Sequence, residues 1–167
     1  LLRLEAETVG KSFASYRLAG RQWALPIDAA TQVQAIRPDL QRAPLLRWDQ
    51  VMQAARDGAV LWPLRPPHVL MGFFTLSANL GDPCAVTKGP LVSRKTGMAV
   101  IQALEALADL VDPACRAMDP IAALNALAES PSHRIVPLTY LYAPYARDGY
   151  RPNRIAFHDI PAIGPGG

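Results

Sequence analysis

The feature that most constrains the fold of this chain is an alternation between short apolar runs and longer amphipathic segments. The run 59–64 is apolar and brief, which is typical of a buried strand in a parallel sheet. By contrast, the segment 93–111 carries Met98, Ile101 and Leu104 at helical spacing. Strands that alternate with helices predict an α/β fold with a mixed, mostly parallel sheet flanked by helices.

The same reasoning places the remaining elements. We expect helices over 1–16, 47–57, 68–80, 93–111 and 119–129, and strands over 21–27, 30–36, 59–64, 135–138 and 154–160. Ser93 and Asp119 are expected to cap the last two helices, since their side chains accept hydrogen bonds from free backbone N–H groups. The helix 68–80 is apolar on almost all sides, which predicts burial. Core positions are expected for the three tryptophans: Trp23, Trp48 and Trp62.

Composition excludes several classes of protein. A chain of 167 residues suits one domain with a sizeable core, and only 19% of its residues are charged, which argues against a disordered tail. The formal charge of +3 is spread along the chain, so no nucleic-acid partner is expected. No apolar run approaches the ~20 residues that span a bilayer.

The ends of the chain suggest a fragment, and the two cysteines leave open whether they form a disulfide. The chain begins without Met and ends in Gly-Pro-Gly-Gly, so we expect a piece of a longer protein. Cys84 and Cys115 lie in Pro-containing loops on either side of one predicted helix. Both a disulfide and two reduced, half-buried thiols are compatible with this placement.

The sequence offers no recognisable catalytic constellation. It has no G-x-S-x-G elbow, phosphate-binding glycine loop or H-E-x-x-H pair, so neither a cofactor nor a metal site is indicated. The three histidines, His68, His133 and His158, are far apart in the sequence, and only folding could pair one with a nucleophile. We therefore do not expect an enzyme.

Five residues are candidates for binding a ligand: Asp28, His68, Tyr140, Tyr142 and Tyr145. Asp28 stands among apolar residues, where it either accepts ligand hydrogen bonds or makes a salt bridge or cap. The tyrosines either stack on sugar rings or cover the end of the sheet. His68 either points into a cleft from a helix N-terminus or is a partly exposed cap residue.

Several short motifs follow one another in a fixed order along almost the whole chain. They are RQWALPIDAATQV at 21–33, RPDL at 37–40, RWDQV at 47–51, LSANLG at 76–81, PLTYLYAPYAR at 137–147 and FHDIP at 157–161. This ordered set resembles bacterial extracellular solute-binding proteins of the carbohydrate ABC-transporter type, which are relatives of maltose-binding protein with the type 2 periplasmic binding fold. The chain departs from the family pattern at Arg47, where Thr is usual, at Leu141, where Gly is usual, and at Ala143-Pro144, where Ser-Asn is usual.

The resemblance implies two lobes with the ligand between them. Residues 1–25 would belong to or lead from the first lobe, residues 26–161 would form the second, ligand-binding lobe, and residues 162–167 would return toward the first. The implied function is a substrate-binding component of an ABC importer, periplasmic or extracellular and membrane-associated, which captures a small solute that we expect to be a sugar. Its partners would be the solute and the membrane permease subunits, and it would be a monomer when full length.

The five candidate residues take roles from the same resemblance. Asp28 would line the cleft in the crossing segment, His68 would lie near the start of a sugar-contacting helix, and Tyr140, Tyr142 and Tyr145 would fall in the stacking loop. Two other functions are alternatives to a solute-binding protein. One is an α/β enzyme domain, with His68 or His158 acting as a base beside Asp28 or Asp159. The other is the ligand-sensing domain of a receptor or regulator.

Overall fold

The computed structural model describes residues 2–8, 10–28 and 30–164, and the chain divides into two compact units, Leu1–Thr31 and Gln32–Gly167. The first unit contains α1 (Leu2–Glu7), α2 (Ser12–Ser15) and an antiparallel hairpin of β1 (Arg17–Leu18) and β2 (Arg21–Gln22). The predicted single helix over 1–16 is wrong because Gly10 adopts a φ of 64°, outside the helical region. The predicted strand 21–27 is confined to its first two residues.

The first unit contains little core. Phe13 is buried, whereas Trp23 is 67% exposed, so the prediction that Trp23 is a core residue is wrong. Its indole instead donates a hydrogen bond to the Leu18 carbonyl (3.1 Å) across the hairpin.

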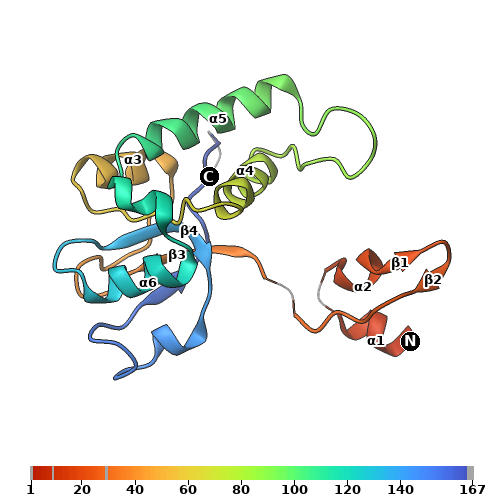
Figure 1. Cartoon of the computed structure of the whole chain (residues 1–167), viewed down its shortest axis with the longest axis horizontal. Helices are drawn as coiled ribbons and strands as arrows, with labels where there is room; N and C mark the ends of the chain where they lie inside the picture. The colour runs from red at the N-terminus through yellow and green to blue at the C-terminus, as the bar shows by residue number, and fades with distance from the viewer. Residues whose placement is uncertain (1, 9, 29, 165–167) are drawn as a thin grey trace. The chain divides into compact units, whose positions relative to one another are not determined.

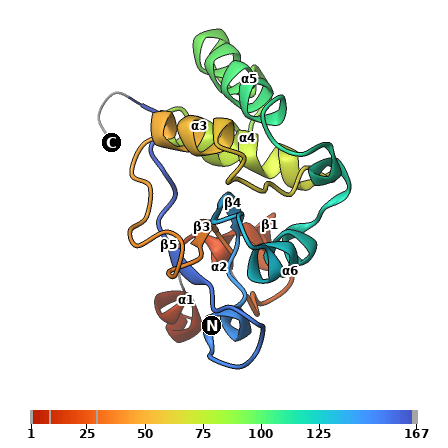
Figure 2. The same ribbon diagram turned by 90° about the vertical axis from the view of Figure 1, so that its left-hand side faces the viewer.

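The second unit is built on a three-stranded sheet in the order β4-β3-β5 (Figures 1 and 2). The central strand β3 (Gln32–Ile36) runs antiparallel to both β4 (Ile135–Tyr140) and β5 (Ala156–His158). The prediction of a mostly parallel sheet is therefore wrong, although the α/β class is confirmed. Gln32 pairs with Tyr140 and Ile36 with Ile135, so β4 ends at the edge where β3 begins.

The segment 59–64 shows why the parallel prediction failed. Val60 does pair with Ile135 in parallel, but this is an isolated bridge. Beyond it the chain turns away from β4, and the Leu64 N–H donates to the carbonyl of Cys115 (3.1 Å). The segment is buried as expected, yet it forms no ladder.

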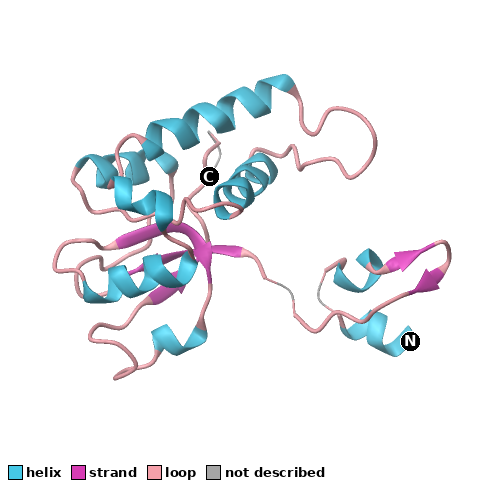
Figure 3. Cartoon of the chain, viewed as in Figure 1, coloured by secondary structure: helices cyan, strands magenta, loops and turns pink. Residues whose placement is uncertain are grey.

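The helices follow the sequence pattern closely. They are α3 (Trp48–Arg56), α4 (His68–Asn79), α5 (Arg94–Ala108) and α6 (Pro120–Glu129), with short 3₁₀ turns η1 (Pro113–Ala117) and η2 (Ala143–Ala146). Ser93 and Asp119 accept hydrogen bonds from Thr96 N (3.2 Å) and Ala122 N (2.8 Å), which confirms both caps. Figures 2 and 3 show α3, α4 and α5 gathered on one side of the sheet.

Helix α3 begins without an acceptor on its N-cap residue, because Arg47 stands there and a guanidinium only donates. Gln50 compensates, because its Oε1 accepts from the backbone N–H groups of Leu46 (2.9 Å) and Arg47 (3.0 Å). The Arg47 guanidinium instead pairs with Asp49. The helix therefore starts at Trp48, one residue after the start expected from the sequence.

The core of the second unit lies between the sheet and the helices. Trp48 and Trp62 are buried in it, as predicted, beside residues such as Val51 and Leu138. Helix α4 is only partly covered, with Leu70 46% exposed, so the prediction of full burial is wrong. Cys84 and Cys115 are both free, Cys115 being buried, and burial raises the pKa of the Cys115 thiol.

Candidate functional site

Asp28 lies in the first unit, in an extended segment after β2. It is exposed, and its neighbours Leu25 (49%) and Ile27 (101%) are exposed as well. The apolar surroundings that the sequence predicted for this carboxylate are therefore not present within the first unit. The other four candidates belong to the second unit, so a site shared with Asp28 stays a prediction.

His68 is the first residue of α4. Its backbone N–H donates to the Arg65 carbonyl (2.9 Å), and its ring is partly buried. The Nδ1 atom is buried and has no hydrogen-bond partner among the described residues. Pro67 occupies the N-cap, and no side chain caps this helix. The N–H groups of Leu70 and Met71 donate to the Pro67 carbonyl (3.0 and 3.2 Å), so backbone carbonyls rather than a side chain serve the first turn of α4.

The three tyrosines have different environments. Tyr140 ends β4 and is half-buried, and burial raises the pKa of its phenol. Tyr142 precedes η2 and is 37% exposed. Tyr145 is 4% exposed, and its hydroxyl donates to Asn125 Oδ1 (2.6 Å) on α6. The expectation that Tyr145 offers an open ring face is therefore wrong, whereas Tyr142 does expose its side chain.

Further contacts hold Tyr145 in place. Its ring packs edge-on against Tyr150, with centroids 5.2 Å apart, and the Arg151 guanidinium lies 5.8 Å from its centroid. The N–H of Ile155 donates to the Tyr145 carbonyl (2.9 Å). This residue therefore anchors the loop that carries Tyr142.

The structure pairs Arg65, which sequence reasoning did not select, with Asp119, which it selected only as a helix cap. Arg65 Nη2 donates to Asp119 Oδ2 (2.8 Å), while Asp119 Oδ1 caps α6. The Ala122 N–H, and further Arg65 and His68, hold the pKa of Asp119 below its usual value. The only available signal was the position of Arg65 directly before Pro66-Pro67 at the start of α4.

These groups lie toward the edge of the sheet where β4 ends. The parallel bridge between Val60 and Ile135 gives the segment 59–64 the same direction as β4, so both lead toward that edge. Helix α4 then turns back over the sheet, since a methyl group on Gly72 would lie 3.6 Å from the Leu138 side chain. The end of β4 and the start of α4 therefore lie toward the same edge of the sheet.

The enzyme alternative gains no support from the histidines. None of the hydrogen bonds within 2–8, 10–28 and 30–164 joins a histidine to a carboxylate. His133 Nδ1 does lie 2.8 Å from Ser130 Oγ, but that oxygen also accepts the backbone N–H groups of Ser132 and His133. The pair is a local turn, which accounts for the contact without catalysis.

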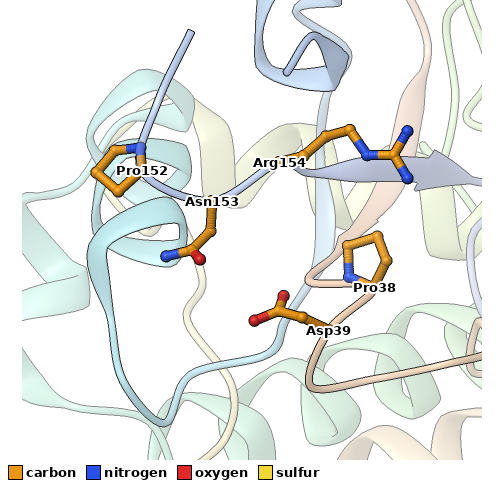
Figure 4. Close-up of a pocket in the computed structure, with 5 residues that line it drawn as sticks. All are labelled: Pro38, Asp39, Pro152, Asn153 and Arg154. Atoms are coloured by element: carbon orange, nitrogen blue, oxygen red, sulfur yellow. The ribbon is translucent and has the colours of Figure 1, made fainter. Parts of the chain in front are cut away.

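Three surface depressions of the described part of the chain are lined by residues other than the five candidates. One of about 350 Å³ is lined by Pro38, Asp39, Pro152, Asn153 and Arg154 (Figure 4) and lies where β3 ends, opposite the Tyr140 edge. A second, apolar depression of about 240 Å³ lies between α4 and α5 and is lined by residues such as Val69 and Ile101. The third, of about 340 Å³, adjoins Trp48 and Ile163.

Comparison with known proteins identifies the fold. No family model matches the chain, and no curated protein matches it. Among solved structures, maltose-bound T. maritima MalE3 matches 98% of this chain and 46% of its own, with a TM-score of 0.76 and 16% identity. The Thermus thermophilus maltotriose binding protein bound with maltotriose matches 100% of this chain over 46% of its own length, with a TM-score of 0.68 and 18% sequence identity.

The chain spans less than half the length of either protein. The expected likeness to maltose-binding proteins is thereby confirmed at the level of the fold. The chain has the α/β fold of part of a sugar-binding protein of the maltose-binding type.

Proposed function

We propose that this chain is part of the substrate-binding component of an ABC importer, which captures a carbohydrate and delivers it to membrane permease subunits. The observation that carries this proposal is the TM-score of 0.76 over 98% of the chain to a protein solved with maltose. Both structural neighbours are binding proteins rather than enzymes, so we propose binding without catalysis, cofactor or metal.

The proposed ligand lies between two lobes. Residues 26–161 form the second lobe, residues 1–25 belong to or lead from the first, and residues 162–167 return toward it. A ligand that contacts both lobes favours the closed state only by the difference in its affinity for the two states. The permease subunits would recognise the closed form. We further propose a periplasmic or extracellular, membrane-associated monomer; no described helix is both long and apolar enough to cross a bilayer.

Within the second lobe, Tyr142 is the main proposed stacking residue. Its side chain is exposed, and an aromatic ring face suits the C–H face of a sugar. Tyr140 and His68 would flank the sugar, and Asp28 would accept hydrogen bonds from its hydroxyls. Tyr145 would contribute by fixing the loop.

The test measures carbohydrate affinity of the full-length protein by calorimetry, with maltose, maltotriose and monosaccharides. Replacement Tyr142→Ala is expected to weaken binding roughly 5-fold to 150-fold, the effect of a 1–3 kcal/mol contact. Tyr142→Phe keeps the ring and is expected to bind nearly as well. Leu141→Ala, at an exposed neighbour (53%), is the matched control.

Two results would contradict the proposal. One is the absence of carbohydrate binding by the full-length protein across the panel. The other is micromolar binding of the sugar by residues 1–167 alone, because a clamp that lacks most of one lobe is expected to bind poorly.

A further inference from the structure

The apolar depression between α4 and α5, called the α4–α5 groove below, is only partly covered by the described chain. Its volume is about 240 Å³, and it is lined by five apolar residues and one glutamate: Trp62, Val69, Ile101, Leu104, Ala108 and Glu105. Trp62 and Leu104 are buried, whereas Ile101 is 43% exposed. The lining residues therefore offer apolar contact and a single carboxylate.

Both helices carry more apolar surface than their contacts within the described chain cover. Helix α5 already buries one apolar stripe, which consists of Val100, Leu104 and Leu107. Met98 and Ile101 lie on another face of α5, three residues apart, and both are more than two-fifths exposed. Helix α4 is apolar on almost all sides, yet Leu70 is exposed as well. A helix at the surface of a globular protein ordinarily has one apolar stripe, and one that is apolar all round is buried. The composition of α4 and α5 is thus typical of helices that are covered on a second side.

A small polar ligand does not suit this groove. Its volume is below the roughly 300–1,000 Å³ of small-molecule sites, and Glu105 is the one polar side chain that could bind a sugar hydroxyl there. Polypeptide is the better cover. The chain spans 46% of the length of each solved neighbour, so under the proposed function a comparable length of polypeptide belongs to the full protein outside residues 1–167. Since the proposed full-length protein is a monomer, this polypeptide rather than a second copy is available to cover the groove.

We propose that the α4–α5 groove is the docking surface for an amphipathic helix of the same polypeptide, from outside residues 1–167. This inference rests on the proposed function, because it requires the longer protein. An irregular segment would bury backbone N–H and C=O groups against apolar side chains, which is costly, whereas a helix pairs these groups internally. The two helices also approach closely, since a methyl group on Gly72 would lie 3.9 Å from the Leu104 side chain. They therefore form one ridged surface on which a third helix can pack.

The test measures how fast a maleimide labels a cysteine in the groove of the full-length protein without sugar, with each site followed by mass spectrometry. Ile101→Cys is expected to react at least about 10-fold more slowly than in the urea-unfolded protein, because a covered thiol reacts only when its contacts open. Ile121→Cys is the matched control, since Ile121 is 46% exposed and lies on α6, outside the groove. Its reaction is expected to be slowed little.

A second measurement identifies what covers the groove. A benzophenone maleimide is attached at Met98→Cys in the Cys84→Ser background, and the peptide that it captures on irradiation is sequenced by mass spectrometry. This peptide is expected to come from the same polypeptide, outside residues 1–167, and to carry apolar residues at helical spacing. A covalent dimer on a denaturing gel, or protection of Ile101→Cys that disappears on dilution, would show a second copy instead and overturn the proposal.

The outcomes separate this inference from the function on which it rests. If Ile101→Cys reacts as fast as in the unfolded protein while maltose or another sugar binds, the docked helix is refuted and the sugar-binding function stands. A captured peptide from within residues 1–167 also refutes the docked helix. If the groove is protected by the same polypeptide and no saccharide binds, the proposed function fails and the docked helix stands.

Discussion

The hydrogen bond between Tyr145 and Asn125 offers a direct test of how the tyrosine loop is held. Tyr145 is 4% exposed and its Oη lies 2.6 Å from Asn125 Oδ1, so Tyr145→Phe deletes one buried donor. Because Asn125 is only half-buried, water can replace the lost partner in part, and we expect a loss of about 1 kcal/mol in the free energy of unfolding. Tyr145→Ala also removes the ring packed on Tyr150 and is expected to lose about 3–5 kcal/mol.

The assay is urea unfolding of the chain at pH 7, followed by the fluorescence of its buried tryptophans. A double-mutant cycle of Tyr145→Phe with Asn125→Ala isolates the pair, and its coupling energy is expected to be about 1 kcal/mol. Tyr142→Phe, at an exposed ring, is the control and is expected to change stability by less than about 0.5 kcal/mol. A coupling energy near zero would show that the bond does not hold the loop.

The same residue predicts a dependence on alkaline pH. Burial raises the pKa of the Tyr145 phenol above its ordinary value of 10.0, so the folded state retains this proton more strongly than the unfolded state. The resulting stability is fully present below pH 10 and is lost as the pH rises through the folded pKa. Unfolding measured between pH 9 and 11 should therefore show a smaller decline in Tyr145→Phe than in the parent chain; an equal decline would contradict this assignment.

Three further substitutions test other parts of the second unit. Gly72→Ala is expected to stabilise α4 by about 0.5–1 kcal/mol in urea unfolding, because the added methyl group would meet its nearest neighbours at 3.6 Å, an ordinary van der Waals distance. Destabilisation would show that the space beside Gly72 is already filled. Ser93→Ala removes the cap of α5 and should cost about 1 kcal/mol, with unchanged stability as the contrary result. The Arg37 guanidinium holds the pKa of Asp39 below 3.8, so this carboxylate stabilises the fold above that pH and loses its effect as the pH falls through the folded pKa. Asp39→Asn should therefore destabilise the chain at pH 7 but little at pH 2. An equal loss of stability at both pH values would refute the pairing of Asp39 with Arg37.

The helices of the second unit could be predicted from sequence because their start signals are local. Asp119 and Pro120 define the start of α6 within two residues, and Ser93 does the same for α5. These interactions depend on atoms within one helical turn. They therefore form wherever the surrounding fold allows a helix.

The sheet could not be predicted in the same way, since strand partners are far apart in the sequence. Alternation of strands and helices indicates parallel neighbours, but β3 takes the central position and runs antiparallel to both β4 and β5. The segment 59–64, which would have been the parallel neighbour of β4, has a proline at 63 and bonds to η1 instead. Pro63 disfavours a longer ladder, but nothing within the segment 59–64 specifies η1 as its partner.

The tyrosine loop shows the same limit at the scale of single residues. Tyr140 ends a strand and Tyr145 sits in a 3₁₀ turn, so the spacing of two and then three residues spans a change in backbone geometry. Which ring is buried depends on α6, where Asn125 supplies the acceptor for Tyr145. Under the proposed function this division has a consequence, because ordering a loop on binding costs conformational entropy. A loop already fixed by Tyr145 loses less freedom when Tyr142 stacks on a sugar, so Tyr145 would support affinity without contacting the ligand.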